Sequence, residues 1–233
     1  MTRTLLAVAL ATTTATLTAA CSLATPNDLL NDAAETAPSE SIDTTLHDAI
    51  AELPVDDEVR DGYDRDKFKH WIDEDDNGCD TRYEVLISEA VDEPDVSDDC
   101  DLTGGKWLSY YDNEEFTDPG DLDIDHMVPL AESWDSGARD WTDDDRERYA
   151  NDLDEEAGLV AVSASSNRQK GDQDPAEWMP SEEDVACQYV TEWTIVKTRW
   201  QLSVDETEKG VLEDISADCE DVDLTIEYAM PTS

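Results

Sequence analysis

Positively charged residues are scarce in this sequence. Lysine and arginine together number 15, with only six lysines among them, whereas aspartate and glutamate number 61, so the 233-residue chain has a formal net charge of −46. Such a surface repels polyanions, and binding to nucleic acid therefore requires salt screening or basic residues concentrated at one place. The aspartate-rich, lysine-poor composition also fits an exported protein of a saline habitat, with stability and activity that rise with salt.

Long apolar runs are absent as well. Beyond the N-terminus no segment has the ~18 apolar residues of a membrane span. Residues 1–20 combine Arg3, a short apolar stretch and small residues before Cys21, which predicts a signal peptide. The end of this segment, "LTAAC", resembles a bacterial lipoprotein signal with Cys21 as the lipidated residue, and ordinary signal-peptidase cleavage is the alternative. We therefore expect an extracellular protein that meets the membrane only through a lipid anchor on Cys21.

The sequence has no C-x-x-C pair, which argues against a zinc site. When Cys21 is set aside, four cysteines remain, and an exported chain with four cysteines favours two disulfides. Three pairings are possible, and we favour the sequence-local one, Cys79–Cys100 with Cys187–Cys219. Each would close a loop of a few tens of residues and stabilise the fold by about 3 kcal/mol.

Composition divides the chain into segments. Residues 21–53 are rich in Ala, Thr, Ser, Pro and acidic residues and are predicted to be an acidic linker. Residues 54–225 contain amphipathic segments with most of the aromatic residues, which argues against a disordered acidic protein, and are predicted to form one domain. Residues 226–233 are predicted to be a tail. We expect a monomer.

Hydrophobic periodicity predicts helices and a few short strands in this domain. Helical patterns begin at Pro54, continue around residues 85–90, and follow at 129–137, 142–153, 181–201 and 205–218. Strand patterns cover 106–116, where a hairpin is expected, and 122–128 and 158–163. The fold class indicated is α+β, mostly helical.

One of the three histidines follows an aspartate in "DLDIDHMVPLAESW" (121–134). This segment, with "NGCDTR" (77–82), "SASSNRQKGDQDPAEW" (163–178) and "VKTRWQLSVDETEK" (196–209), resembles the HNH (ββα-metal) endonuclease family. The resemblance is to the exported bacterial subgroup related to the C-terminal domain of GmrSD-type restriction endonucleases. Several separated motifs in the right order carry it.

The resemblance implies a ββα-metal core and a phosphodiester hydrolase that acts on nucleic acid, most simply DNA. It implies that His126 is the general base and that Asp125 and Asn167 bind one divalent cation, Mg²⁺ or Mn²⁺. An ordinary imidazole pKa of about 6.5 would suit the base near neutral pH. Neighbouring residues of an ideal strand point to opposite faces, so the family arrangement implies a bend that directs Asp125 and His126 to one phosphate.

The few basic residues near these motifs are candidates for phosphate binding. Arg168 and Lys170 stand beside Asn167, and Arg82 belongs to the "DTR" motif. Arginine and lysine at a metal site are typical phosphate contacts, and ordinary surface ion pairing is the alternative. Asn151 resembles the middle Asn of the HNH name, but the insertion after it leaves its role open.

A second pattern favours another kind of site. "DEDDNGCDTRYE" (73–84) has the spacing of a calcium-binding loop, with helical patterns on both sides. Asp73, Asp75, Asn77 and Glu84 would be the side-chain ligands of a structural Ca²⁺. The alternative to a nuclease is therefore a non-catalytic, calcium-stabilised surface lipoprotein on a nuclease-like scaffold.

Overall fold

The computed structural model describes residues 40–229, and of Glu183 only the backbone. The predicted signal peptide, Cys21 and most of the predicted linker lie outside the described residues. Within the described part of the chain, no helix has the length and apolar character needed to cross a membrane.

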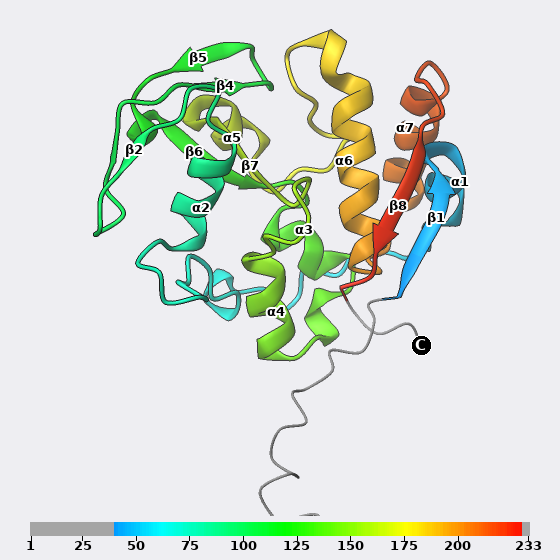
Figure 1. Cartoon of the computed structure of the whole chain (residues 1–233). Helices are drawn as coiled ribbons and strands as arrows, with labels where there is room; N and C mark the ends of the chain where they lie inside the picture. The colour runs from blue at the N-terminus through cyan, green and yellow to red at the C-terminus, as the bar shows by residue number, and fades with distance from the viewer. Residues whose placement is uncertain (1–39, 230–233) are drawn as a thin grey trace, which may run out of the picture. The chain divides into compact units, whose positions relative to one another are not determined.

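The two ends of the described chain pair with each other. Strand β1 (Ser41–Thr45) lies antiparallel to β8 (Asp223–Glu227), and helix α1 (Leu46–Glu52) follows β1 (Figure 1). Leu46 and Ile50 of α1 are buried in the main core. The predicted linker is therefore wrong for residues 41–53, and the predicted tail is wrong where β8 extends to Glu227. Both segments are mostly polar in composition, but a few of their apolar residues, among them Leu46, Ile50 and Ile226, are buried.

The helix predicted to begin at Pro54 is also wrong. Residues 54–80 are mostly irregular, with one short 3-10 turn, η1 (Arg65–Lys67). Gly62 and Trp71 have positive φ angles of 79° and 60°, which a continuous helix does not allow. The predicted helix near 85 is present as α2 (Thr81–Ser88), which begins where the Asp80 side chain accepts a hydrogen bond from the Tyr83 amide.

Two short hairpins follow α2. Strands β2 (Asp95–Val96) and β3 (Leu102–Thr103) pair, and β4 (Trp107–Ser109) pairs with β5 (Glu114–Phe116), where a hairpin was predicted. The disulfide Cys79–Cys100 ties the loop before α2 to the first hairpin. This half of the predicted disulfide pairing is confirmed.

The centre of the domain is a pair of antiparallel strands followed by a helix. β6 (Leu122–His126) pairs with β7 (Leu159–Ser163), with His126 opposite Leu159, and α5 (Ala164–Lys170) continues from β7. The chain between the strands contains α3 (Leu130–Asp135), the 3-10 turn η3 (Ala138–Asp140) and α4 (Asp143–Ala150). A further 3-10 turn, η2 (Pro119–Asp121), precedes β6. Helix α4 begins with a capping box, in which Thr142 and Asp145 bond to each other's backbone amides.

Hydrophobic side chains cover both faces of the β6–β7 pair. Leu159 and Ala161 of β7 belong to a smaller core with Val85 and Leu86 of α2. Val160 and Val162, which alternate with them, belong to the main core. This alternation is the two-residue period of a strand buried on both sides.

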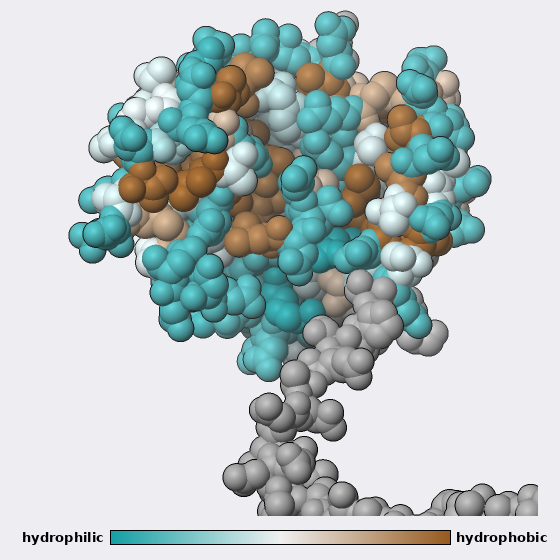
Figure 2. All heavy atoms as spheres, viewed as in Figure 1, coloured by the Kyte–Doolittle hydropathy of each residue, from teal (hydrophilic) through white to brown (hydrophobic). Residues whose placement is uncertain are grey.

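The C-terminal helices complete the main core. η4 (Glu183–Val185) leads into α6 (Ala186–Arg199), and α7 (Glu206–Ser216) packs beside it (Figure 1). Tyr189 and Trp193 of α6 are fully buried, and the disulfide Cys187–Cys219 links α6 to the chain after α7, which confirms the second predicted pairing. On the face in Figure 2, hydrophilic residues cover most of the surface and hydrophobic residues form separate patches.

Candidate active site

Two residues of α5 face two residues of β6. Alternate residues of a strand point to the same side, so Asp123 and Asp125 lie on one face of β6. The Asn167 side-chain amide donates to Asp123 Oδ2 at 3.4 Å, and the Lys170 ammonium donates to Asp125 Oδ2 at 2.5 Å. Asn167 and Lys170 are three residues apart and share one face of α5. Helix α5 therefore packs on β6 in a register that pairs Asn167 with Asp123.

The sequence predicted that Asp125 and Asn167 form a ligand pair. In this register Asn167 instead contacts Asp123, which lies two residues before Asp125 and was not predicted from the sequence. The alternation in "DIDH" carried the signal, because it places a second carboxylate on the Asp125 face of the strand. The Asp123 side chain is 33% exposed, whereas Asp125 is buried.

Lys170 is not positioned to contact phosphate, and this prediction is wrong. Its side chain is fully buried, and Nζ donates to Asp125 Oδ2 and to the backbone carbonyls of His126 and Met127, at 2.9 and 2.8 Å. Burial lowers the pKa of Lys170, and the charge and hydrogen bond of Asp125 oppose that shift because they stabilise the ammonium. Lys170 therefore holds the turn that follows β6.

Asp125 contributes one carboxylate oxygen to this network. Oδ2 accepts hydrogen bonds from Lys170 and from the Tyr111 hydroxyl, the latter at 2.6 Å. Across residues 40–229, no hydrogen bond reaches the other oxygen, Oδ1. One oxygen of Asp125 is thus used by the fold, and the second is available to an ion.

His126 has a defined tautomer. Its Nε2 lies 3.0 Å from the backbone carbonyl oxygen of Ala150, which can only accept, so Nε2 carries the proton and Nδ1 the lone pair. The ring stacks on Tyr149, with centroids 6.3 Å apart, and lies 5.7 Å from the Trp71 ring and 6.5 Å from the His70 ring. The Asp125 and His126 side chains have separate partners, so the fold alone does not bring these two side chains together.

The buried imidazole of His126 is neutral near physiological pH. Burial lowers its pKa to about 3, the positive charge of Arg65 acts in the same direction, and the hydrogen bond to Ala150 opposes both. The ordinary pKa of 6.5 expected from the sequence does not apply here. Within residues 40–229 no hydrogen bond reaches Nδ1, so the neutral imidazole can accept a proton there, and it remains in that form well into the acidic range.

This pKa shift predicts a contribution to acid sensitivity. The unfolded chain binds a proton at residue 126 below about pH 6.5, whereas the folded chain does so only near pH 3, so this residue lowers the free energy of unfolding as pH falls between those values. From pH 7.5 to 5.0 we expect wild type to lose about 2 kcal/mol more than His126→Gln. Urea unfolding of both proteins at the two pH values tests this, and parallel losses would contradict it.

The two arginines predicted to bind phosphate differ in exposure. One guanidinium nitrogen of Arg82 donates to the backbone carbonyls of Pro119 and Leu122, at 3.0 and 2.9 Å, so Arg82 holds the start of β6. The Arg168 side chain is 77% exposed, with Nε 3.7 Å from Asp123 Oδ2. Arg168 therefore lies beside the Asp123–Asn167 pair and retains room for a ligand.

Asn151 has a structural role in this fold. Its side-chain amide donates to the backbone carbonyls of Lys69 and Glu147, and its oxygen accepts from the Ile72 amide and the Thr81 hydroxyl. The side chain is buried, and it joins the end of α4 to the loop that carries His70 and Trp71. Asn151 therefore holds the aromatic neighbours of His126 in place.

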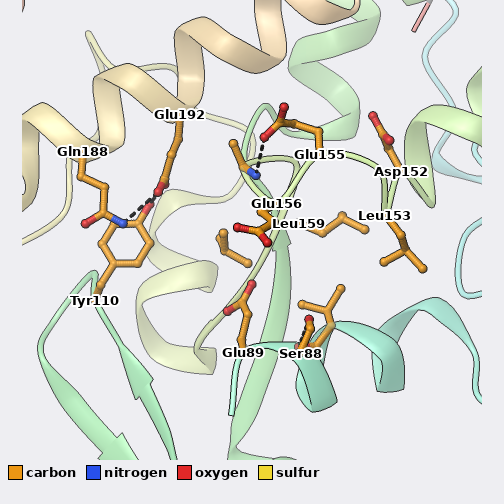
Figure 3. Close-up of a pocket in the computed structure, with 13 residues that line it drawn as sticks. Ser88, Glu89, Tyr110, Asp152, Leu153, Glu155, Glu156, Leu159, Gln188 and Glu192 are labelled. Atoms are coloured by element: carbon orange, nitrogen blue, oxygen red, sulfur yellow. Dashed lines mark hydrogen bonds between the residues drawn. The ribbon is translucent and has the colours of Figure 1, made fainter. Parts of the chain in front are cut away.

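A cavity of about 530 Å³ is lined by Leu159 and Val160 of β7, the strand partners of His126 and Asp125, but it does not coincide with this site (Figure 3). Five carboxylates line it, from Glu89, Asp152, Glu155, Glu156 and Glu192, and its walls include none of the six residues predicted to act in catalysis or binding. So acidic a cavity repels phosphate groups. It is a poor candidate for a nucleic-acid site.

The predicted calcium loop has a helix on one side only, since α2 follows it and no α-helix precedes it among residues 54–80. The Asn77 amide group nevertheless connects its acidic residues: Nδ2 donates to Asp75 and Glu84 at 3.0 and 2.8 Å, and the Asp73 carboxylate accepts from the Asn77 and Gly78 backbone amides. The helix–loop–helix expectation is wrong, and calcium binding here stays a prediction.

Comparison with known proteins identifies the family. The sequence model for GmrSD restriction endonucleases, C-terminal domain, matches residues 66–214. The chain belongs to this family of GmrSD C-terminal domains. It is also 41% identical, over 160 residues, to an uncharacterized secreted protein of Arthroderma benhamiae, and the match covers 69% of this chain and 77% of that protein. No solved structure matches.

The family match confirms the resemblance seen in the sequence. The GmrSD C-terminal domain is nuclease-like, and all residues of the β6–β7–α5 arrangement lie inside the matched range. The secreted relative and the two disulfides are consistent with an extracellular location.

Proposed function

We propose that this protein is an exported, metal-dependent endonuclease of the HNH type that hydrolyses phosphodiester bonds, with DNA as the favoured substrate. The observation that carries the proposal is the β6–β7–α5 arrangement, in which Asp123 of β6 contacts Asn167 of α5, and His126 ends the strand with no hydrogen bond to Nδ1 from the described residues. The family match supports it independently. We also propose that a lipid on Cys21 anchors the enzyme outside the cell.

His126 is the proposed general base. The hydrogen bond to Ala150 fixes the ring and leaves Nδ1 to accept a proton from an attacking water. The carbonyl also stabilises the protonated ring that this transfer forms, because Nε2–H continues to donate to it. The pKa of about 3 ensures the neutral form before reaction, but it also makes the isolated imidazole a weak base. A bound phosphodiester beside the ring would raise that pKa, since its negative charge favours the imidazolium.

A divalent cation fits the opposite face of β6. Asp123, Asp125 Oδ1 and Asn167 offer only oxygen ligands, a set that favours Mg²⁺ or Mn²⁺ over Zn²⁺. When bound, such an ion would neutralise charge on the phosphate and stabilise the leaving oxygen. Neighbouring strand residues point to opposite faces, so a phosphate that contacts both the cation and His126 would have to lie across the end of β6. Arg168 is the proposed phosphate contact.

The test of the metal ligands is a nicking assay with supercoiled plasmid across Mg²⁺ and Mn²⁺ concentrations. We expect Asp123→Asn and Asn167→Ala each to raise the half-saturating metal concentration by roughly tenfold or more, because the first replaces a carboxylate with a neutral amide and the second removes an amide oxygen. Gln169→Ala is the matched control on the same helix, where the side chain is exposed and bonds only to Ser165.

The outcomes separate three possibilities. Wild-type cleavage that EDTA abolishes supports a metal-dependent nuclease. If the Asp123 and Asn167 variants respond to metal as Gln169→Ala does, the cation lies elsewhere. A folded wild-type protein that cleaves neither DNA nor RNA with either metal would overturn the proposed function.

A further inference from the structure

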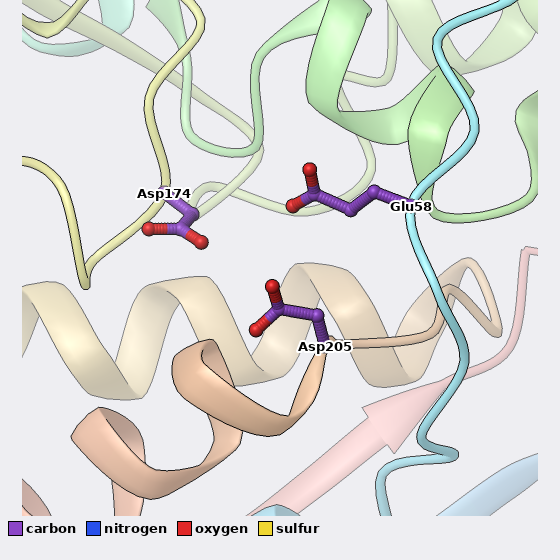
Figure 4. Close-up of side chains that lie close together, drawn as sticks. All are labelled: Glu58, Asp174 and Asp205. Carbon is purple, nitrogen blue, oxygen red and sulfur yellow. The ribbon is translucent and has the colours of Figure 1, made fainter.

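Five carboxylates from four separate segments converge away from the candidate active site. Glu58 comes from the irregular chain before η1, Glu132 and Asp135 from α3, Asp174 from the loop after α5, and Asp205 from the start of α7. We call this set the Glu58 cluster. Figure 4 shows Glu58, Asp174 and Asp205 directed toward a common space.

The distances within the Glu58 cluster suit one ion. Carboxylate oxygens of Glu58, Asp174 and Asp205 all lie within 4.8 Å of one another, and so do those of Glu58, Glu132 and Asp135. Two oxygens on opposite sides of a Ca²⁺ ion are about 4.6–5.2 Å apart, so both groups are compact enough to share one such ion. Mg²⁺ dehydrates reluctantly and usually binds through one or two carboxylates, so a set of three or more protein carboxylates favours Ca²⁺.

Positive charge in the protein does not balance this cluster. Lys197 binds Glu132 and Glu208, and Arg60 binds Asp135 and Asp172, so each cation is already shared between two carboxylates. Within the described residues, no ion pair involves Glu58, Asp174 or Asp205. Burial and the charges of its four neighbours raise the pKa of Glu58 to about 7, which reflects the same excess of negative charge.

A buried oxygen without a partner is an independent sign of a missing ligand. Asp135 is 1% exposed, and its Oδ1 has no hydrogen-bond partner among the described residues, although Oδ2 binds Arg60. A buried carboxylate oxygen without a partner lowers the stability of the fold, because it has lost its hydrogen bonds to water and formed none in the protein. The Asp135 carboxylate is one of those that lie against Glu58.

Asp174 and Asp205 each have one carboxylate oxygen that is not used in a hydrogen bond within residues 40–229. Asp174 Oδ1 accepts the backbone amides of Ala176 and Glu177, and Asp205 Oδ1 accepts those of Thr207 and Glu208. These bonds fix both carboxylates rigidly, while Oδ2 of each has no hydrogen bond among residues 40–229. A site with prepositioned oxygens needs little reorganisation to bind a cation.

We propose that the Glu58 cluster binds a structural Ca²⁺ ion through Glu58, Asp135, Asp174 and Asp205, with Glu132 adding negative charge beside it. The ion would join the chain before η1 to α3, α7 and the loop after α5. This proposal is independent of nuclease activity, since none of these residues belongs to the candidate active site.

The test is calcium titration of the EDTA-treated, purified full-length protein, followed by calorimetry and by melting temperature. We expect Ca²⁺ at about 100 times its dissociation constant to raise Tm by roughly 5 °C or more, and Mg²⁺ to act more weakly. In Glu58→Gln the Ca²⁺ response of the cluster should be lost. In EDTA this variant should melt above wild type, because one of five repelling charges is gone.

Two control variants locate the ion. Asp57→Asn removes a neighbouring exposed charge, and Glu84→Gln removes a predicted ligand of the loop at 73–84; both should keep the heat of Ca²⁺ binding that Glu58→Gln loses. The proposal is overturned if Glu58→Gln binds Ca²⁺ as wild type does, if only Glu84→Gln loses binding, or if wild type binds no Ca²⁺. None of these results depends on cleavage of nucleic acid.

Discussion

Replacing His126 with alanine is expected to lower the rate of phosphodiester cleavage by about 10²–10⁴-fold, the usual cost of losing a general base. The imidazole has its Nε2 proton directed to the Ala150 carbonyl and its Nδ1 lone pair free, so it is oriented to accept a proton. Alanine removes that acceptor. The measurement is the initial rate of plasmid nicking at saturating Mg²⁺, with each variant compared at the same concentration of folded protein.

Burial of His126 requires a control for folding. The ring packs against Tyr149 and Trp71, so alanine also leaves a cavity that lowers the free energy of unfolding. His126→Gln fills more of that space and can still donate a hydrogen bond, and it should be as inactive as the alanine variant. His47→Ala removes a half-exposed histidine bonded to Ser216, and it should cleave at the wild-type rate. Wild-type turnover by a folded His126→Gln protein would exclude His126 as the base.

Acid should affect catalysis less than an ordinary histidine would suggest. With the pKa of His126 lowered to about 3, the free enzyme keeps this base neutral through pH 5. The two effects of burial thus act in opposite directions: the catalytic form persists in acid, while the fold loses stability there. Activity and stability measured over the same pH series distinguish them.

Most elements from α2 onward could be predicted from local patterns. Alternating residues predicted β6, a short apolar run predicted β7, and helical patterns predicted α4, α6 and α7. The disulfide pairing followed from chain proximity. These features depend on residues a few positions apart, which a sequence displays directly.

The prediction for the N-terminal part was wrong because its structure depends on contacts between residues far apart in the chain. Residues 41–53 resemble a linker in composition, and they fold only because β1 pairs with β8, about 180 residues later in the chain. The helical periodicity after Pro54 was real, but Phe68 is buried against Trp134 and Tyr149, and the partly buried Tyr63 packs on Trp134, rather than on a helix face. Contacts at such long range leave no local signal.

The candidate site could be predicted as a set of residue types but not as a set of contacts. The motif located Asp125, His126 and Asn167, yet the register of α5 on β6 decides that Asn167 meets Asp123 and that Lys170 meets Asp125. Because Lys170 lies beside the metal motif in the sequence, it was predicted to bind phosphate. Only the packing of α5 shows that this lysine is buried, since sequence places Arg168 and Lys170 near one another while the helix turns them to different sides.

Lys170→Met is expected to have the largest effect on stability of any single substitution at the candidate site. It leaves the Asp125 carboxylate and two backbone carbonyls, those of His126 and Met127, without their buried cation. Breaking a buried ion pair by removing one partner typically costs about 3–5 kcal/mol. For a domain of this size that corresponds to a fall in Tm of roughly 10 °C. Differential scanning calorimetry measures it.

A second substitution separates this structural role from phosphate binding. Lys170→Met combined with Asp125→Asn removes the unpaired charge, so it should recover part of the lost Tm without restoring cleavage. Arg168→Met, at an exposed position, should leave Tm nearly unchanged and weaken DNA binding instead. If Lys170→Met melts as wild type does and merely binds DNA less tightly, then its ammonium reaches the substrate, and the register of α5 on β6 described here is wrong.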